Sequence, residues 1–336
     1  MTINEVKFIF RILTINRIWN LIKLHVGFWI SRILRKPVLL GDPFAVSIEP
    51  TTVCNLKCPE CPTGLGTLKR SKGTMVLDTF NRVISGLSPN TFYVNMYLQG
   101  EPFIHPNLIE WIEMLNTKRL FTVVSTNAQL IDEKIAERIV LSGLSKIIIA
   151  LDGLTQQSYS VYRRGGFVDK VYNSIDYLQK AKKKHNISTP IIVAQFLAFK
   201  HNQSEINSLK QLKLRGVNSV EVKIPQFDLE SHKIVQPSSE KKLTRYFPNN
   251  GNLVIKSKRY SHCWRIWSSM VISWDGNSYP CCFDKDGDFE IGSVNNLGLE
   301  YIWKSDSFMS VRKNILKRRQ SIKMCNNCTE GVKWWI

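Results

Sequence analysis

The chain has 336 residues, of which 43% are hydrophobic and 22% charged, a composition typical of a globular enzyme with one large and one small domain. Its net charge of +19 favours an anionic partner or surface, but the sequence carries no paired zinc fingers and no RNP motif, so we expect no nucleic-acid partner. Eight cysteines are too few for a disulfide scaffold and fall in metal-ligand spacings, which predicts a cytoplasmic, metal-binding protein.

Residues 1–43 are predicted to form a basic, apolar, helical extension. Lysine or arginine interrupts the apolar residues throughout, and the longest uncharged stretch, Leu24–Ser31, is far shorter than the roughly 18 apolar residues that a spanning helix needs. No small-residue cleavage site follows, so the segment does not resemble a secretory signal. Two interpretations stay open: an interfacial helix with peripheral association at the inner membrane surface, and helices packed on the enzyme body. The apolar positions do not fall on one clean face.

The middle of the chain, residues 44–235, alternates short apolar runs with helical stretches, which is typical of consecutive βα units and a parallel sheet. Six strands are predicted, at Ala45–Glu49, Tyr93–Leu98, Leu120–Ser125, Lys146–Leu151, Ile191–Ala198 and Ser219–Ile224. Five helices are predicted between them, at Thr79–Leu87, Leu108–Asn116, Asp132–Ser142, Lys170–Lys184 and Gln203–Arg215. Six such units predict an α/β fold with an open, partial barrel, whose functional residues gather at the C-terminal ends of the strands.

Three cysteines follow the first predicted strand at the spacing Cys54-x3-Cys58-x2-Cys61. A four-iron cluster is normally held by four thiolates, so three leave one iron able to bind another ligand. The alternative is a zinc knuckle or three core cysteines, but no second Cys or His pair lies nearby to complete a tetrahedral zinc site. The spacing therefore predicts an iron-sulfur cluster with an open coordination position.

The other five cysteines lie in residues 236–336, which we predict to form a small auxiliary-cluster domain; they are Cys263, Cys281, Cys282, Cys325 and Cys328. Four thiolates suffice for a second, fully ligated cluster. Cys281 fits a Gly-x4-Cys spacing after Gly276, which leaves Cys282 as a core thiol or as the true ligand. A structural zinc ribbon is the alternative interpretation of this segment.

The Cys54 spacing resembles the signature of the radical S-adenosylmethionine (SAM) enzymes, and the C-terminal segment resembles a SPASM or twitch module with one auxiliary cluster. This segment includes Trp274–Asp284, Ile291–Val294 and Tyr301–Trp303. The resemblance implies a partial (β/α)6 barrel, a [4Fe-4S] cluster that binds SAM, one auxiliary [4Fe-4S] cluster and a flavodoxin- or ferredoxin-type reductant. In that superfamily, reductive cleavage of SAM gives a 5′-deoxyadenosyl radical that abstracts hydrogen.

The resemblance also implies SAM-binding residues. The tetrapeptide Gln99-Gly100-Glu101-Pro102 matches a Gly-Gly-Glu-Pro motif whose exposed backbone and carboxylate receive the SAM ammonium, with Gln99 replacing the first glycine. Ser125 and Asn127 stand where the family contacts the ribose and carboxylate, although they could equally cap the next helix. Arg163 stands where an arginine pairs with the SAM carboxylate, with Arg164 as runner-up. Glu60 departs from the aromatic residue often found before the third cysteine, which puts adenine packing there in doubt.

The substrate is harder to predict than the cofactors. Our first hypothesis is oxidation of a small molecule, such as an anionic or lipid-linked sugar or glycan, with the auxiliary cluster accepting the electron. A second is peptide maturation by thioether formation or epimerisation, and a third is sugar epimerisation with Cys282 as hydrogen-atom donor. From another class, a non-catalytic metal protein that binds nucleic acid would also explain the positive charge.

Overall fold

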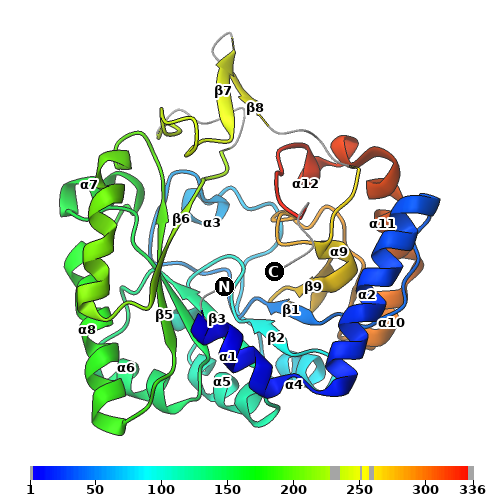
Figure 1. Cartoon of the computed structure of the whole chain (residues 1–336), viewed down its shortest axis with the longest axis horizontal. Coiled ribbons are helices and arrows are strands. Elements are labelled where there is room, and N and C mark those ends of the chain that lie inside the picture. Colours follow the sequence, from blue (N-terminus) through cyan, green and yellow to red (C-terminus); the bar gives the residue numbers. More distant parts are fainter. Residues whose placement is uncertain (1–2, 228–234, 250–251, 257–260, 332–336) are drawn as a thin grey trace.

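The computed structural model describes residues 3–227, 235–249, 252–256 and 261–331 of the chain. Five short stretches of the three predicted units (residues 1–43, 44–235 and 236–336) lie outside the described residues: 1–2, 228–234, 250–251, 257–260 and 332–336. Strands occupy the centre of the molecule and most helices its outside (Figure 1).

The described residues form one nine-stranded sheet in the order β11-β10-β9-β1-β2-β3-β4-β5-β6. Six strands are those predicted, namely β1 (Ala45–Ile48), β2 (Tyr93–Asn95), β3 (Phe121–Thr126), β4 (Lys146–Ala150), β5 (Ile191–Leu197) and β6 (Ser219–Lys223). Each of them pairs in parallel with the next, from Ala45 opposite Tyr93 in the first pair to Leu197 opposite Lys223 in the last. Strands β4 and β5 are almost wholly apolar because helices cover them, as expected for a parallel sheet.

Five helical segments lie close to where they were predicted, namely α4 (Leu77–Gly86), α5 (Leu108–Thr117), α6 (Glu133–Leu141), α8 (Val168–His185) and the 3₁₀ turns Gln203–Arg215. A further crossover helix, α7 (Gln156–Tyr162), was not predicted. Asp132 caps α6 by accepting a hydrogen bond from the backbone N–H of Ile135 at 2.7 Å. In the 3₁₀ segment the buried residues Leu209 and Leu212 are three positions apart, which suits three residues per turn.

The C-terminal part extends the same sheet. It contains β9 (Ser269–Ile272), β10 (Asn277–Tyr279), β11 (Gly292–Ser293), α9 (Arg265–Ser268), α10 (Leu299–Lys304), α11 (Asp306–Arg318), α12 (Lys323–Asn326) and the 3₁₀ turn Arg319–Ser321. Strand β9 pairs in parallel with β1, from Ala45 opposite Ser269 to Ile48 opposite Ile272. The sheet therefore continues across the domain boundary that we predict near residue 235. Strands β7 (Tyr246–Asn249) and β8 (Asn252–Ile255) form a separate antiparallel hairpin that projects from the molecule (Figure 1).

Two helices precede the sheet, α1 (Ile3–Ile12) and α2 (Ile15–Leu34). Helix α1 lies in front of β3 (Figure 1), where Phe8 packs edge-on against Phe121 and Glu5 pairs with Lys146 at 2.5 Å. Helix α2 packs against α9, and its Trp29 and Ile33 line a small cavity together with Leu316 of α11. Nowhere in the described ranges does a helix have both the length and the apolar character needed to cross a bilayer.

Candidate active site

The loop after β1 places three thiols together. Cys58 is buried, and Cys54 and Cys61 pack around the same small apolar cluster. Burial raises the pKa of the Cys58 thiol to about 11; the charge of Arg163 acts against this rise, and the Cys61 and Cys54 thiols add to it. The three thiols thus interact electrostatically. Thiolates are the usual ligands of an iron-sulfur cluster, and the iron would replace the thiol protons. Within the described residues, no group of three or more His, Cys, Asp or Glu side chains could hold a metal ion in the present arrangement.

Three polar side chains each contact a different cysteine of this loop. Gln99 Oε1, after β2, lies 3.8 Å from Cys61 Sγ. Asn127 Nδ2, after β3, lies 3.9 Å from Cys54 Sγ. Arg163 Nη1, after α7, lies 3.8 Å from Cys58 Sγ. Three loops that are far apart in the sequence thus bring their predicted SAM-binding side chains to the cysteines.

Arg163 is fixed by a buried ion pair. Its Nε lies 2.6 Å from Asp152 Oδ2, and the Asp152 side chain is fully buried just after the end of β4. The other Asp152 oxygen accepts a hydrogen bond from the Leu197 N–H at 2.7 Å, which ties the pair to β5. This pair orients the guanidinium toward the cysteines, and it involves Asp152, to which the sequence analysis gave no role.

The carboxylate of Glu101, which the resemblance assigns to the SAM ammonium, is buried. It accepts hydrogen bonds from Thr126 Oγ1 and the Asn127 N–H, both at 2.7 Å, and from the Phe103 N–H at 3.2 Å. Glu101 therefore joins the two loops that carry Gln99 and Asn127, and its contact with SAM stays a prediction.

The rest of that tetrapeptide shapes the loop. Gly100 has φ of +74°, and a Cβ there would lie 2.4 Å from the Thr51 carbonyl oxygen. Pro102 is buried and begins a 3₁₀ turn, Pro102–Ile104. At position 100 only glycine fits the tight approach between the β2 loop and the residues before Cys54.

Ser125, another predicted SAM-binding residue, lies on β3 with a half-buried side chain.

Glu49, at the end of β1, connects the cysteine loop with the C-terminal part. Arg70 donates two hydrogen bonds to its carboxylate, at 2.6 and 2.5 Å. The Gln99 N–H donates to the same carboxylate at 3.2 Å and the Trp274 N–H at 3.4 Å. Arg70 Nε also donates to the Lys285 carbonyl at 2.8 Å. Sequence analysis missed this buried junction because nothing local links an acid after a strand to a distant arginine.

The cysteines of the C-terminal part form a second group of thiols. Burial raises the pKa of Cys325 to about 12, and the Cys263 and Cys328 thiols add to the rise. The pKa of Cys281 is raised by its hydrogen bond to Cys282, by burial and by Cys263. Cys263 therefore raises the pKa of two other predicted ligands, Cys281 and Cys325. Arg319 supports this group: its Nη2 lies 3.6 Å from Cys328 Sγ.

Cys282 is in a different electrostatic setting from Cys281. Its pKa is lowered to about 6 by the hydrogen bond from Cys281 and by Arg265, whose Nη1 lies 3.4 Å from its sulfur. Both thiols line a cavity of about 620 Å³, here called the barrel cavity, together with Asn95 and Tyr97 of the β2 segment. Cys282 is thus accessible from the interior of the partial barrel.

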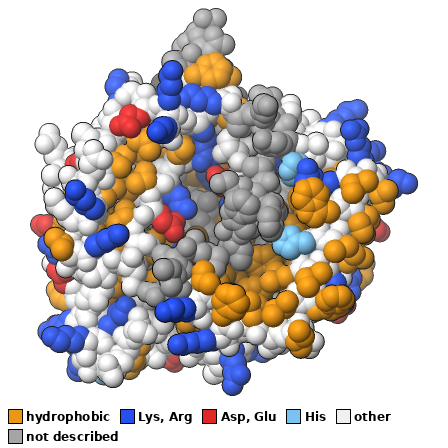
Figure 2. Space-filling view, in the orientation of Figure 1, with side chains coloured by type: hydrophobic (Ala, Val, Ile, Leu, Met, Phe, Trp, Pro, Cys, Tyr) orange, Lys and Arg blue, Asp and Glu red, His pale blue; other side chains and the backbone are white. Residues whose placement is uncertain are grey.

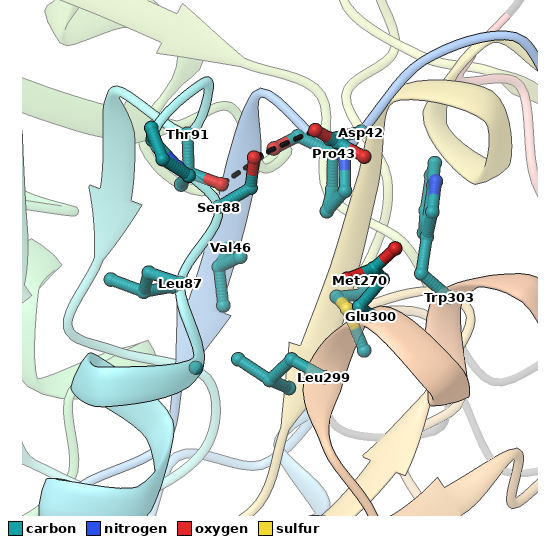
Figure 3. A pocket seen from close by; sticks show the side chains of 12 residues that line it. Asp42, Pro43, Val46, Leu87, Ser88, Thr91, Met270, Leu299, Glu300 and Trp303 are labelled. Carbon is teal, nitrogen blue, oxygen red and sulfur yellow. Dashed lines mark hydrogen bonds between the residues drawn. The ribbon is translucent and has the colours of Figure 1, made fainter.

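Two other cavities lie outside the barrel. An outer groove of about 500 Å³ lies between the Cys54 loop and α12, lined by Glu60, Lys69, Asp286 and Lys323 among others. A smaller cavity of about 250 Å³ lies between the end of α4 and α10, where Ser88 Oγ donates to Asp42 at 2.7 Å (Figure 3). No cysteine lines the smaller cavity among the residues that the structure describes, so its residues do not belong to the site.

Two stretches of the chain match known families. Residues 48–195 match the radical SAM superfamily, and residues 263–329 match the SPASM iron-sulfur cluster-binding domain. The chain thus contains a radical SAM domain followed by a SPASM domain. These domains imply a [4Fe-4S] cluster with SAM and auxiliary iron-sulfur binding, which confirms the cofactors predicted from the sequence.

The chain is similar in sequence to a bacteriocin biosynthesis protein. It is 26% identical over 281 residues to the antilisterial bacteriocin subtilosin biosynthesis protein AlbA of Bacillus subtilis, covering 78% of this chain and 60% of AlbA. The chain thus spans less than two thirds of that relative. Among solved structures, SuiB of Streptococcus suis bound to precursor peptide SuiA has a TM-score of 0.65 at 17% identity, covering 86% of this chain and 70% of SuiB. BtrN in complex with AdoMet and 2-DOIA has a TM-score of 0.56 at 17% identity, and the match covers 88% of this chain and 96% of BtrN.

Proposed function

We propose that this radical SAM enzyme modifies a peptide. The observation that carries the proposal is the similarity to AlbA, which extends over 78% of this chain and so beyond either family match alone. SuiB, which has the same fold, is bound to a precursor peptide. These relatives favour peptide maturation over the small-molecule oxidation that we placed first from the sequence.

The residues of the site support specific roles in this proposal. When bound, the cluster and SAM supply a 5′-deoxyadenosyl radical that removes a hydrogen atom from the substrate. Cys54, Cys58 and Cys61 hold that cluster. The polar side chains beside them, Asn127 and Arg163, bind and orient the polar groups of SAM. The four C-terminal ligands Cys263, Cys281, Cys325 and Cys328 hold one auxiliary cluster.

The barrel cavity is the proposed place for the reacting part of the substrate. It is lined from one side by the barrel strands β1 and β2 and from the other by Cys281 and Cys282. Its volume of about 620 Å³ is within the range of ligand sites in proteins and would admit a side chain with its flanking backbone. The Lys223 and Arg265 cations and the Glu330 carboxylate also line it and offer polar contacts to a peptide.

The test is a turnover assay under anaerobic conditions with the reconstituted enzyme, SAM and dithionite. Candidate precursor peptides and a library of sugars and aminocyclitols are offered separately, and products are analysed by mass. Thioether formation removes two hydrogens from a peptide, whereas epimerisation leaves its mass unchanged and incorporates deuterium from solvent. Modification of a sugar but of no peptide would overturn the proposal.

A second candidate, oxidation of a small molecule, is favoured by the extent of the similarity to BtrN. The shared fold covers 96% of that chain, so this enzyme contains nearly all of the BtrN architecture. In this case the substrate would be a sugar, a glycan or a lipid-linked glycan that loses two hydrogens, one as an atom and one as a proton, with the remaining electron passing to the auxiliary cluster. The same assay distinguishes the two candidates.

A further inference from the structure

Helix α2 has one face buried against the enzyme body and one face exposed. The buried face contains Arg17, Asn20, Leu24, Gly27, Phe28 and Ser31. Phe28 packs against the rings of Trp264 and Trp267 at 5.3 and 5.6 Å. The Trp267 indole N–H also donates to Ser31 Oγ at 3.2 Å. These contacts hold α2 firmly on the enzyme body, which confirms one of the two interpretations of this segment.

The other face is an exposed apolar stripe. Its members recur every three or four residues along the helix and are Ile15, Ile18, Trp19, Ile22, Val26, Trp29 and Ile33. Their exposed fractions range from 41% for Ile18 to 77% for Ile15 and Ile33. Figure 2 shows hydrophobic side chains gathered over α2, along the right side of the molecule. A contiguous apolar surface of this kind marks an interaction site, whereas single exposed apolar residues do not.

Positive charge borders the stripe. Lys23 is exposed on one side of the helix, and Arg32 lies on the other, with its guanidinium 4.2 Å from the Trp29 ring. Arg35 and Lys36 are exposed just after the helix. Helix α2 contains no aspartate or glutamate. The stripe is therefore apolar in the middle and cationic at its edges.

We propose that this stripe binds the surface of an anionic lipid bilayer. Tryptophan and isoleucine on one face, with lysine and arginine at the edges, are the composition that lies in the bilayer interface. Each basic residue near an anionic surface adds to the attraction. A second copy of the chain is a poorer occupant, because two-fold pairing of this face would bring the same cations together with no acid on α2 to balance them.

The test measures sedimentation of the 336-residue chain with vesicles of phosphatidylcholine alone and of phosphatidylcholine with phosphatidylglycerol. We expect binding to the anionic vesicles that weakens as salt is raised. The variant Trp19→Glu/Trp29→Glu should lose binding on the order of tenfold or more, because it adds negative charge to the stripe and leaves the buried face intact. Deleting residues 1–40 would be a poorer test, since it uncovers Trp267.

The matched control is Leu214→Glu/Leu141→Glu, which makes the same charge change at two exposed apolar residues on elements away from α2 (90% and 53% exposed). It should bind vesicles nearly as the parent does. Equal binding by the stripe variant and the control would overturn the proposal, as would absence of binding by the parent protein. A dimer of the parent in solution that the stripe variant makes monomeric, without vesicle binding, would identify a second copy as the occupant and also overturn it.

Discussion

At the residue scale, the site depends on one-to-one contacts between polar side chains and cysteines. Gln99, Asn127 and Arg163 each lie 3.8 to 3.9 Å from a different sulfur of the Cys54 loop. A cofactor held by that loop would therefore meet an amide or a guanidinium on several sides. The Gln99 amide oxygen is an acceptor that suits the amino group of SAM, and the Asn127 and Arg163 N–H donors suit its carboxylate and ribose oxygens.

Replacing Cys54, Cys58 or Cys61 by alanine should abolish SAM cleavage, because two thiolates cannot both hold the cluster and leave one iron open. The measurement is 5′-deoxyadenosine released after anaerobic reconstitution. Val53→Ala, an exposed neighbour in the same loop, serves as the control and should retain cleavage. Continued formation of 5′-deoxyadenosine by the triple cysteine variant would contradict the assignment.

Replacing Arg163 by alanine should both weaken SAM binding and destabilise the fold. The substitution leaves the fully buried Asp152 carboxylate without its partner, which costs about 3–5 kcal/mol for a buried pair. Arg82→Ala breaks the exposed pair with Asp78 and should cost less than about 1 kcal/mol. Urea unfolding of the three proteins measures the difference, and equal free energies of unfolding for both variants would show that the Asp152 pair does not stabilise the structure.

At the scale of elements, the strand-end loops are joined by buried acids. Glu101 links the loops after β2 and β3, and Glu49 links β1, Arg70 and the start of the turn at Trp274. Each carboxylate satisfies several donors that would otherwise be buried without an acceptor. The site is thus carried by loops whose positions are fixed by hydrogen bonds as well as by packing.

Substituting Gly100 by alanine should disturb the loop after β2. The positive φ costs about 1–2 kcal/mol for a residue with a Cβ, and the clash with the Thr51 carbonyl adds to it. Gly298→Ala is the control for a Cβ without a clash, because no atom lies within 4 Å of a Cβ there; Gly298 is the N-cap of α10, where glycine is preferred to alanine, so we expect a cost of up to about 1 kcal/mol. Thermal unfolding and SAM binding are measured for both. An unchanged melting temperature and affinity for the Gly100 variant would show that this approach is not tight in solution.

At the scale of the whole molecule, one sheet carries both groups of cysteines. The Cys54 loop follows β1, and β9, which pairs directly with β1, leads through β10 to Cys281. The barrel cavity lies along this pairing and reaches Cys281 and Cys282. A substrate in that cavity would therefore contact both the barrel strands and the auxiliary cysteines.

The double substitution Cys325→Ala/Cys328→Ala should separate the two metal sites. We expect loss of about half of the iron with SAM cleavage retained, because the Cys54 loop keeps its own three ligands. Cys282→Ala should leave the iron content nearly unchanged, whereas a loss equal to that of Cys281→Ala would show that Cys282 is the ligand. Iron analysis and 5′-deoxyadenosine assays give both readouts. Complete loss of cleavage in the double variant would show that the two sites do not assemble independently.

The sequence by itself determined the family, the six parallel strands and the loops that carry the site. These features are local: cysteine spacing, apolar runs and the alternation of strand with helix are all visible within short windows. For the same reason the amino-acid sequence was enough to name Cys54, Cys58, Cys61, Gln99 and Asn127, although their roles as ligands stay predictions.

Only the tertiary structure decided which distant groups meet. It buried the Glu101 carboxylate, joined Glu49 to Arg70 and Asp152 to Arg163, and placed β9 beside β1. It also showed that the apolar residues of α2 form two faces, one packed on Trp267 and one exposed, where the sequence shows only an irregular pattern. Such pairings depend on the path of the chain between residues far apart in sequence, and local periodicity carries no information about that path.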